Sequence, residues 1–215
     1  MSRKRVVTTR NRGKKKADRP TFWIFAGPNG SGKSTVYETA QIAEIRGTVW
    51  IINPDLLTAR IANVERRPNP NLEAVRRIER WLEASIQTHQ TIGVETVLST
   101  DKYRRLVRAA KKLNFEIRLI YVILKNADLN VERVKLRVAN GGHDVPEEKI
   151  RSRYYRSLKQ LPWFLKEADR ATLYDNSGAK PKTIARKADG ILTLDPRAMP
   201  AIKKIAEHVR TKGKH

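Results

Sequence analysis

The chain has 215 residues and a formal net charge of +23, which arises from 45 Lys and Arg residues against 22 Asp and Glu residues. It contains no cysteine, which excludes disulfides, thiolate metal sites and a cysteine nucleophile. No apolar run is as long as a transmembrane helix, and no apolar signal segment stands at the N-terminus, so we expect a cytoplasmic protein. The length suits one domain with a hydrophobic core.

Residues 1–20 are predicted to form a disordered basic arm, separate from a folded domain at 21–215. The arm holds nine basic residues and one acid, Asp18, and it shows no hydrophobic periodicity. A tail that binds nucleic acid and a plain solubilising extension both fit, although the arm has no aromatic side chain to stack on a base. The remaining residues carry +15. This charge favours polyanions such as nucleic acid, nucleotide sugars or an acidic protein, and a solvated basic surface is the alternative.

The strongest motif fits the P-loop pattern G-x-x-x-x-G-K-[ST] at every fixed position. An apolar run predicts a strand at 21–26 before it, and a helix is predicted at 36–43 after it. In such a loop the backbone N–H groups point at phosphate oxygens, and the helix N-terminus adds partial positive charge. Lys33 is predicted to reach the β- and γ-phosphates, and the Ser34 hydroxyl to ligate Mg²⁺. We therefore expect a nucleoside triphosphate to bind at Gly27, Pro28, Asn29, Gly30, Ser31, Gly32, Lys33, Ser34 and Thr35.

The rest of the chain alternates predicted strands and helices, which is typical of a parallel α/β sheet. Apolar runs predict further strands at 47–52, 91–94, 115–124, 171–174 and 190–194. Helices are predicted at 71–87, 103–113, 127–139, 147–165 and 200–209. The first of these helices is expected to bury one apolar face, formed by Leu72, Val75, Ile78, Leu82 and Ile86. The expected fold class is α/β, a P-loop NTPase or kinase-like parallel sheet flanked by helices.

Two acids follow predicted strands, where ligands of α/β sheets bind. Asp55 is a candidate general base that takes a proton from an acceptor hydroxyl, and a helix N-cap is an equal alternative. Glu95 is a candidate to bind acceptor hydroxyls or to hold Mg²⁺ through water, the alternative being a structural carboxylate. Hydroxyls on the loop after Glu95 are candidates to line a polar acceptor site, and they belong to Thr96, Ser99 and Thr100.

A glycine-rich bend at 141–142 lies between two basic helices and predicts a hinged helical lid. Guanidinium groups on such a lid stabilise the charge that spreads over a transferring phosphoryl group. A solvated basic face is the alternative for several of them. The candidates are Arg133, Arg137, Arg151, Arg153 and Arg156. His143 lies in the bend, where turn capping is favoured, and the four scattered histidines indicate no zinc site.

The ordered set of motifs resembles the zeta-toxin family of P-loop kinases, in particular its short members, over residues 21 to about 180. The matching segments are 26–35, 53–55, 95–99, 137–146, 153–154 and 174–178. Members of this family phosphorylate a sugar hydroxyl of UDP-N-acetylglucosamine with ATP and Mg²⁺, and a small antitoxin protein inhibits them. The Gly-Gly-His-Asp-Val-Pro bend at 141–146 is more typical of the short members, many of which look like stand-alone kinases.

The resemblance implies that Lys33 binds phosphate, that Asp55 is the base and that Glu95 belongs to the acceptor site. It implies that Arg137 and Arg153 clamp the migrating phosphoryl group, and that an antitoxin protein is a candidate partner. We expect an ATP- and Mg²⁺-dependent small-molecule kinase. A nucleic-acid-directed kinase or ATPase, and a nucleotide-gated binding protein without catalysis, are the alternatives.

Overall fold

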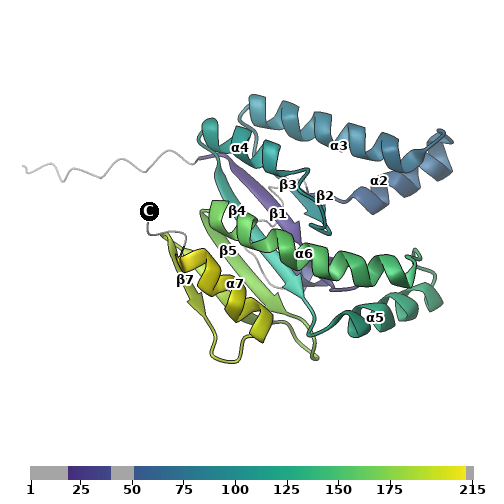
Figure 1. Ribbon diagram of the computed structural model, residues 1–215. Coiled ribbons are helices and arrows are strands. Elements are labelled where there is room, and N and C mark those ends of the chain that lie inside the picture. Colours follow the sequence, from purple (N-terminus) through teal and green to yellow (C-terminus); the bar gives the residue numbers. More distant parts are fainter. Residues whose placement is uncertain (1–18, 40–50, 212–215) are drawn as a thin grey trace, which may run out of the picture.

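The computed structural model in Figure 1 describes residues 19–39 and 51–211, with the backbone alone at 37–39, 55 and 211. The predicted arm therefore lies outside the described residues except for Arg19 and Pro20. Arg19 donates hydrogen bonds to the carbonyls of Asn114 and Phe115 at 2.9 and 2.8 Å. The predicted helix at 36–43 and the predicted strand at 47–52 are each described only in part.

Seven strands form one sheet in the order β2-β3-β1-β4-β5-β6-β7. The first five in this order are parallel. They are β2 (Ile51–Ile52), β3 (Ile92–Thr96), β1 (Thr21–Ala26), β4 (Glu116–Ile123) and β5 (Arg170–Asp175). Strand β1 lies inside the sheet between β3 and β4 and is fully buried, as its apolar run before the phosphate loop predicts.

The sheet is mixed, so the predicted parallel sheet is incomplete. Strands β6 (Lys182–Ala188) and β7 (Ile191–Leu194) pair antiparallel at one edge. The links into both strands are short, and a short link joins only antiparallel neighbours. Strand β6 escaped prediction because basic residues surround its two buried apolar side chains, Ile184 and Ala185.

Helices cover one face of the sheet in the view of Figure 1, where α4, α6 and α7 lie in front of the strands. Two pairs, α2 with α3 and α5 with α6, extend past the sheet on the same side of the molecule (Figure 1). The bounds are α1 (Lys33–Thr39), α2 (Pro54–Arg60), the π-helix η1 (Ile61–Glu65), α3 (Pro70–Gln87), α4 (Arg104–Lys112), α5 (Ala127–Ala139), α6 (Glu147–Glu167) and α7 (Pro200–Thr211). No helix within the described residues is long and apolar enough to cross a membrane.

The main hydrophobic core lies between the sheet and the helices that cover it. It joins strand residues such as Phe22 and Tyr121 to helix residues such as Leu82 and Phe164, all of them buried. The predicted buried face of α3 is correct at its sheet end but wrong at Leu72, which is 50% exposed. Leu72 lies in the first turn of α3, at the outer end of the helical pair, where no strand lies beneath it.

Candidate functional site

The loop between β1 and α1 has a backbone shape that only glycine permits at two positions. Gly27 has a φ of +147°, and a Cβ there would lie 2.1 Å from the Val122 carbonyl oxygen. Gly32 has a φ of +82°, and a Cβ there would lie 2.4 Å from Asn176 Nδ2. The glycines of the motif therefore let the loop pack against β4 and against the loop after β5.

Two buried asparagines brace this loop through its carbonyl groups. Asn130 of α5 donates from Nδ2 to the Asn29 carbonyl at 2.6 Å, and Asn176 donates from Nδ2 to the Ser31 carbonyl at 2.9 Å. Both side chains are buried, so these bonds fix the loop from inside the protein. Asn176 belongs to segment 174–178, one of the motifs noted in the sequence. The contact of Asn130 with the phosphate loop was not predicted. The signal for it is a polar residue on the otherwise apolar inner face of α5.

Glu95 brings together the residues expected to bind phosphate and metal. Its carboxylate lies 3.7 Å from Lys33 Nζ and accepts hydrogen bonds from Ser34 Oγ at 3.4 Å and from Asn53 Nδ2 at 3.0 Å. Lys33 also donates to the carbonyls of Gly27 and Pro28 at 2.9 and 3.3 Å. Glu95 is a residue of β3 itself, one position before the strand ends, whereas the sequence predicts it just after the strand.

The hydroxyl of Ser34 and the carboxylate of Glu95 are oxygen donors of the kind that Mg²⁺ prefers. Within residues 19–39 and 51–211 no cluster of three or more His, Asp or Glu side chains could hold a metal without help. A Mg²⁺ ion at this place would therefore depend on phosphate oxygens for most of its coordination, which is common for Mg²⁺ in nucleotide sites.

Asn53, not Asp55, caps helix α2. The Asn53 side-chain oxygen accepts a hydrogen bond from the Leu56 backbone N–H at 3.3 Å, which is the N-cap arrangement. Asp55 is the second residue of α2, so the N-cap alternative for it is wrong. Its side chain lies outside the described residues, and its role as a base stays a prediction.

Three of the five predicted lid arginines face the phosphate loop, and each donates to a neutral oxygen. Arg133 bonds the Asn176 carbonyl at 2.7 Å, Arg137 the His143 carbonyl at 2.5 Å, and Arg153 the Asn29 side-chain oxygen at 3.3 Å. No carboxylate among the described side chains pairs with them, so their charge is directed at whatever lies above the loop.

The other two predicted lid arginines do not belong to the site. Arg151 pairs with Asp128 at 2.6 Å and with Glu147 at 2.8 Å, which raises the pKa of its guanidinium. Arg156 is exposed and does not line the cavity above the loop.

A cavity of about 610 Å³ lies above the phosphate loop, and its lining includes Lys33, Ser34, Asn53, Glu95, Arg133, Arg137 and Arg153. Val75 of α3, Lys102 and Tyr103 form part of its wall on the side away from the arginines. Burial raises the pKa of the Tyr103 phenol and lowers the pKa of the Lys102 amine, whose nitrogen lies 4.7 Å from the Tyr103 ring centroid. The predicted hydroxyls of the acceptor loop also line it, at Thr96, Ser99 and Thr100.

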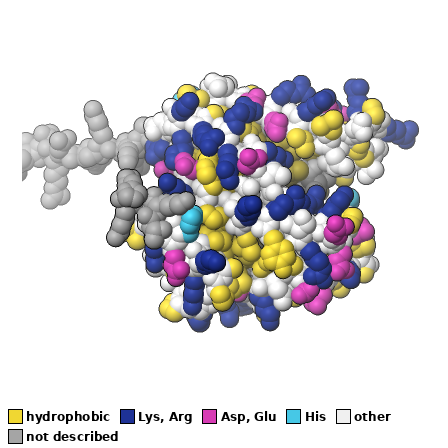
Figure 2. Space-filling model, in the orientation of Figure 1, with side chains coloured by type: hydrophobic (Ala, Val, Ile, Leu, Met, Phe, Trp, Pro, Cys, Tyr) yellow, Lys and Arg dark blue, Asp and Glu magenta, His cyan; other side chains and the backbone are white. Residues whose placement is uncertain are grey.

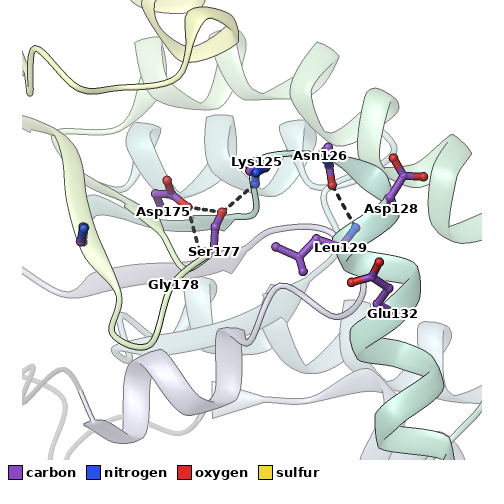
Figure 3. A pocket seen from close by; sticks show the side chains of 9 residues that line it. Lys125, Asn126, Asp128, Leu129, Glu132, Asp175, Ser177 and Gly178 are labelled. Carbon is purple, nitrogen blue, oxygen red and sulfur yellow. Dashed lines mark hydrogen bonds between the residues drawn. The ribbon is translucent and has the colours of Figure 1, made fainter.

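A second cavity of about 540 Å³, shown in Figure 3, lies between the start of α5 and the loop after β5. Ser177 donates to the Asp175 carboxylate at 2.5 Å and accepts from the Lys125 backbone N–H at 2.8 Å, which fixes that loop. Glu132 and Ser177 line this cavity. Arg133, which follows Glu132, and Asn176, which precedes Ser177, contact the phosphate loop region. The two cavities share no lining residue, and only the first was predicted from the sequence.

Comparison with protein families matches residues 22–157, more than half of the chain, to a family described as AAA domain. The chain belongs to this AAA domain family. A protein of Haemophilus influenzae, described as an uncharacterized protein, is 28% identical to this AAA domain protein over 131 residues, which are 61% of this chain and 90% of the relative.

Solved structures show the same fold at low sequence identity. A chain of the AvrRxo1-ORF1:AvrRxo1-ORF2 complex with ATP matches with a TM-score of 0.66 and 15% identity, over 89% of this chain and 63% of that chain. This AAA domain protein thus spans less than two thirds of that relative. A chain of the PezAT chromosomal toxin–antitoxin system of Streptococcus pneumoniae matches with a TM-score of 0.62 and 15% identity, over 94% of this chain and 89% of that chain. These likenesses confirm the expected P-loop kinase-like fold and agree with the resemblance to zeta toxins.

Proposed function

We propose that this protein is a kinase that uses ATP and Mg²⁺ to phosphorylate a hydroxyl group of a small molecule. One arrangement carries the proposal. Lys33 and Ser34 contact Glu95 in the lining of a cavity, and the same cavity is lined by three arginines that donate to uncharged oxygens. Membership of the AAA domain family and the fold shared with a structure determined with ATP support nucleotide binding.

In this proposal the triphosphate lies along the phosphate loop in the 610 Å³ cavity. Lys33 binds the β- and γ-phosphates, and Arg133, Arg137 and Arg153 stabilise the charge on the γ-phosphoryl group during transfer. The nucleoside extends toward the 540 Å³ cavity, because its lining residues Glu132 and Ser177 directly neighbour Arg133 and Asn176 in the sequence. Mg²⁺, held by Ser34 and through water by Glu95, neutralises phosphate charge when bound.

The acceptor occupies the opposite wall, near Glu95, Thr96 and Tyr103. Asp55 takes the proton of the acceptor hydroxyl while that oxygen forms a bond to the γ-phosphorus. The bond between the γ-phosphorus and the β–γ bridging oxygen breaks, and ADP leaves with that oxygen. A sugar nucleotide such as UDP-N-acetylglucosamine is one candidate acceptor, on the resemblance to zeta toxins. The names of both structural neighbours describe two-component complexes, which supports an antitoxin-like protein partner.

The test incubates the purified chain with Mg²⁺-ATP and a panel of UDP-sugars, and mass spectrometry identifies the products. We expect one phosphorylated sugar nucleotide from the unmodified chain. Lys33→Ala and Asp55→Asn should each lower turnover at least about 100-fold, because they remove a phosphate ligand and the base. Asp189→Asn, at an exposed turn, is the matched control and should leave turnover unchanged.

Retained transfer in Asp55→Asn would remove the assignment of the base. ATP consumption without a phosphorylated sugar would direct the search to other acceptors and keep the kinase. If ATP binds but is never turned over with any acceptor, the kinase proposal fails and a nucleotide-gated binding protein replaces it.

A further inference from the structure

The seam between α4 and α6 carries positive charge that the candidate site does not use. Arg104 of α4 donates from Nη2 to Gln160 Oε1 of α6 at 2.8 Å. The guanidinium carbons of Arg104 and Arg108 lie 5.0 and 5.4 Å from the ring centroid of Trp163. An amide and an aromatic ring thus hold these cations in place without neutralising them.

The exposed cations along this seam lack acidic partners. Arg108, Lys112, Arg156 and Lys159 are exposed and form no ion pair with any described residue. The ion pair that does bridge the two helices joins Lys111 to Glu167 at 2.7 Å. Figure 2 shows dark blue side chains gathered in a row along α6 and over α4, with few acidic side chains among them. This surface therefore attracts a chain of negative charges.

One face of α6 leads along the seam from the candidate site. Arg153, Arg156, Gln160, Trp163 and Glu167 recur at helical spacing, so they share this face, and Arg153 and Arg156 are its cations. Arg153 at one end of this face lines the cavity above the phosphate loop, as does Lys102 just before α4. From Arg153 to Glu167 the helix rises about 21 Å. A linear polyanion on the seam would therefore end at the cavity mouth.

An exposed aromatic side chain lies one helical turn from Lys159, on the solvent side of α6. Tyr155 is 65% exposed and precedes Arg156, and its ring meets Tyr154 edge-on with the centroids 5.3 Å apart. This exposure leaves much of the Tyr155 side chain open to a partner. Phosphate-binding cations beside an exposed aromatic ring are the features with which proteins bind single-stranded nucleic acid. An acidic protein surface would use the cations but has no need of the ring.

We propose that the α4–α6 seam binds single-stranded nucleic acid. Arg108, Arg156 and Lys159 contact backbone phosphates, and one base stacks on Tyr155. This inference goes beyond the proposed kinase, because binding on the seam requires neither ATP nor turnover.

The test measures fluorescence anisotropy of a labelled single-stranded oligoribonucleotide of about 12 nucleotides, a length within the usual site sizes. The full chain is titrated over a series of salt concentrations without nucleotide. A seam variant carries Arg108→Gln, Arg156→Gln and Lys159→Gln. A control variant loses the same charge elsewhere, through Arg66→Gln, Arg76→Gln and Lys203→Gln, all at exposed positions.

We expect the seam variant to bind at least about tenfold more weakly and to lower the salt slope by about 2, since each phosphate contact on a single strand contributes about 0.7. The control variant should stay close to the unmodified chain. Equal losses in the two variants would overturn the proposal, because they would show attraction by net charge alone. Absence of salt-dependent binding would overturn it as well.

Two further measurements separate nucleic acid from an acidic protein. Tyr155→Ala should weaken binding of the oligoribonucleotide but not of an abasic strand with the same phosphates, and Tyr155→Phe should restore it. If polyglutamate of matched charge displaces the strand from the seam with equal affinity, the surface is a site for an acidic protein and the proposal is wrong. Because these readouts need no phosphoryl transfer, they stand whether or not the kinase proposal holds.

Discussion

At the scale of single residues, the phosphate loop depends on contacts that reach across the whole sequence. Asn130 bonds the loop at Asn29, 101 residues away, and Asn176 bonds it at Ser31, 145 residues away. The sequence predicts the loop itself, because the glycines and Lys33 follow a local pattern. It does not predict Asn130, because only the packing of α5 against the loop selects that residue among the polar ones.

Gly32→Ala tests the close approach of this loop to Asn176. The new Cβ would lie 2.4 Å from Asn176 Nδ2, so the amide must move and the bond to Ser31 is lost. We expect nucleotide affinity to fall at least about tenfold, since a misplaced loop loses its phosphate contacts. Titration with a fluorescent ATP analogue measures this.

Gly141→Ala is the matched control for that change. Gly141 has the same φ of +82°, but a Cβ there meets no atom within 4 Å. Both variants carry the left-handed strain of about 1–2 kcal/mol, and only Gly32→Ala carries the clash. Equal nucleotide affinity in the two variants would show that the contact with Asn176 has no part in shaping the loop.

At the scale of elements, segments with strong hydrophobic periodicity were predicted correctly as helices, whereas segments with weak periodicity were not. Helix α5 has the predicted bounds, and α3 and α6 differ from theirs by at most two residues at either end. A helix at α2 was considered only as an alternative and η1 was missed, because 54–65 is short and its only buried described side chain is Ile61. Strand β6 was missed for a similar reason, since Ile184 and Ala185 are its only buried side chains.

Leu82→Ala and Leu72→Ala compare two leucines of the same helix, α3. Leu82 is fully buried in the main core, whereas Leu72 is half exposed. We expect Leu82→Ala to lower the free energy of unfolding by about 2–5 kcal/mol, because it leaves a cavity under the helix. Leu72→Ala should change it by about 0.5 kcal/mol or less. Denaturant unfolding followed by circular dichroism measures both, and similar losses would contradict the assigned burial of α3.

At the scale of the whole molecule, buried tyrosines make the fold sensitive to alkali. Burial raises the pKa of Tyr103, Tyr121 and Tyr154 above the ordinary value, for Tyr154 to about 12. The unfolded chain titrates its tyrosines near pH 10. Their contribution to stability is therefore complete below about pH 10 and is lost as the pH rises from 10 through the folded-state values.

Tyr154→Phe should reduce the loss of folding stability at alkaline pH. The variant loses the hydrogen bond from Tyr154 to the Leu124 carbonyl, 2.9 Å long, and with it about 1 kcal/mol near neutral pH. Between about pH 10 and 12 its free energy of unfolding should fall less steeply than that of the unmodified chain. Urea unfolding across this range measures the slope. An unaltered slope in Tyr154→Phe would refute the assignment.

The arginines of the candidate site have a consequence for how long the protein stays folded. Arg133, Arg137 and Arg153 face one cavity together with Lys33, and neutral oxygens hold the three guanidinium groups. Gathered like charges repel, so the native state carries an electrostatic stress that a bound polyphosphate relieves. A ligand that binds only the native state stabilises it by about 2.7 kcal/mol at one hundred times its dissociation constant. We therefore expect the abundance of the folded protein to follow the supply of its nucleotide, so that a starved cell would degrade it sooner.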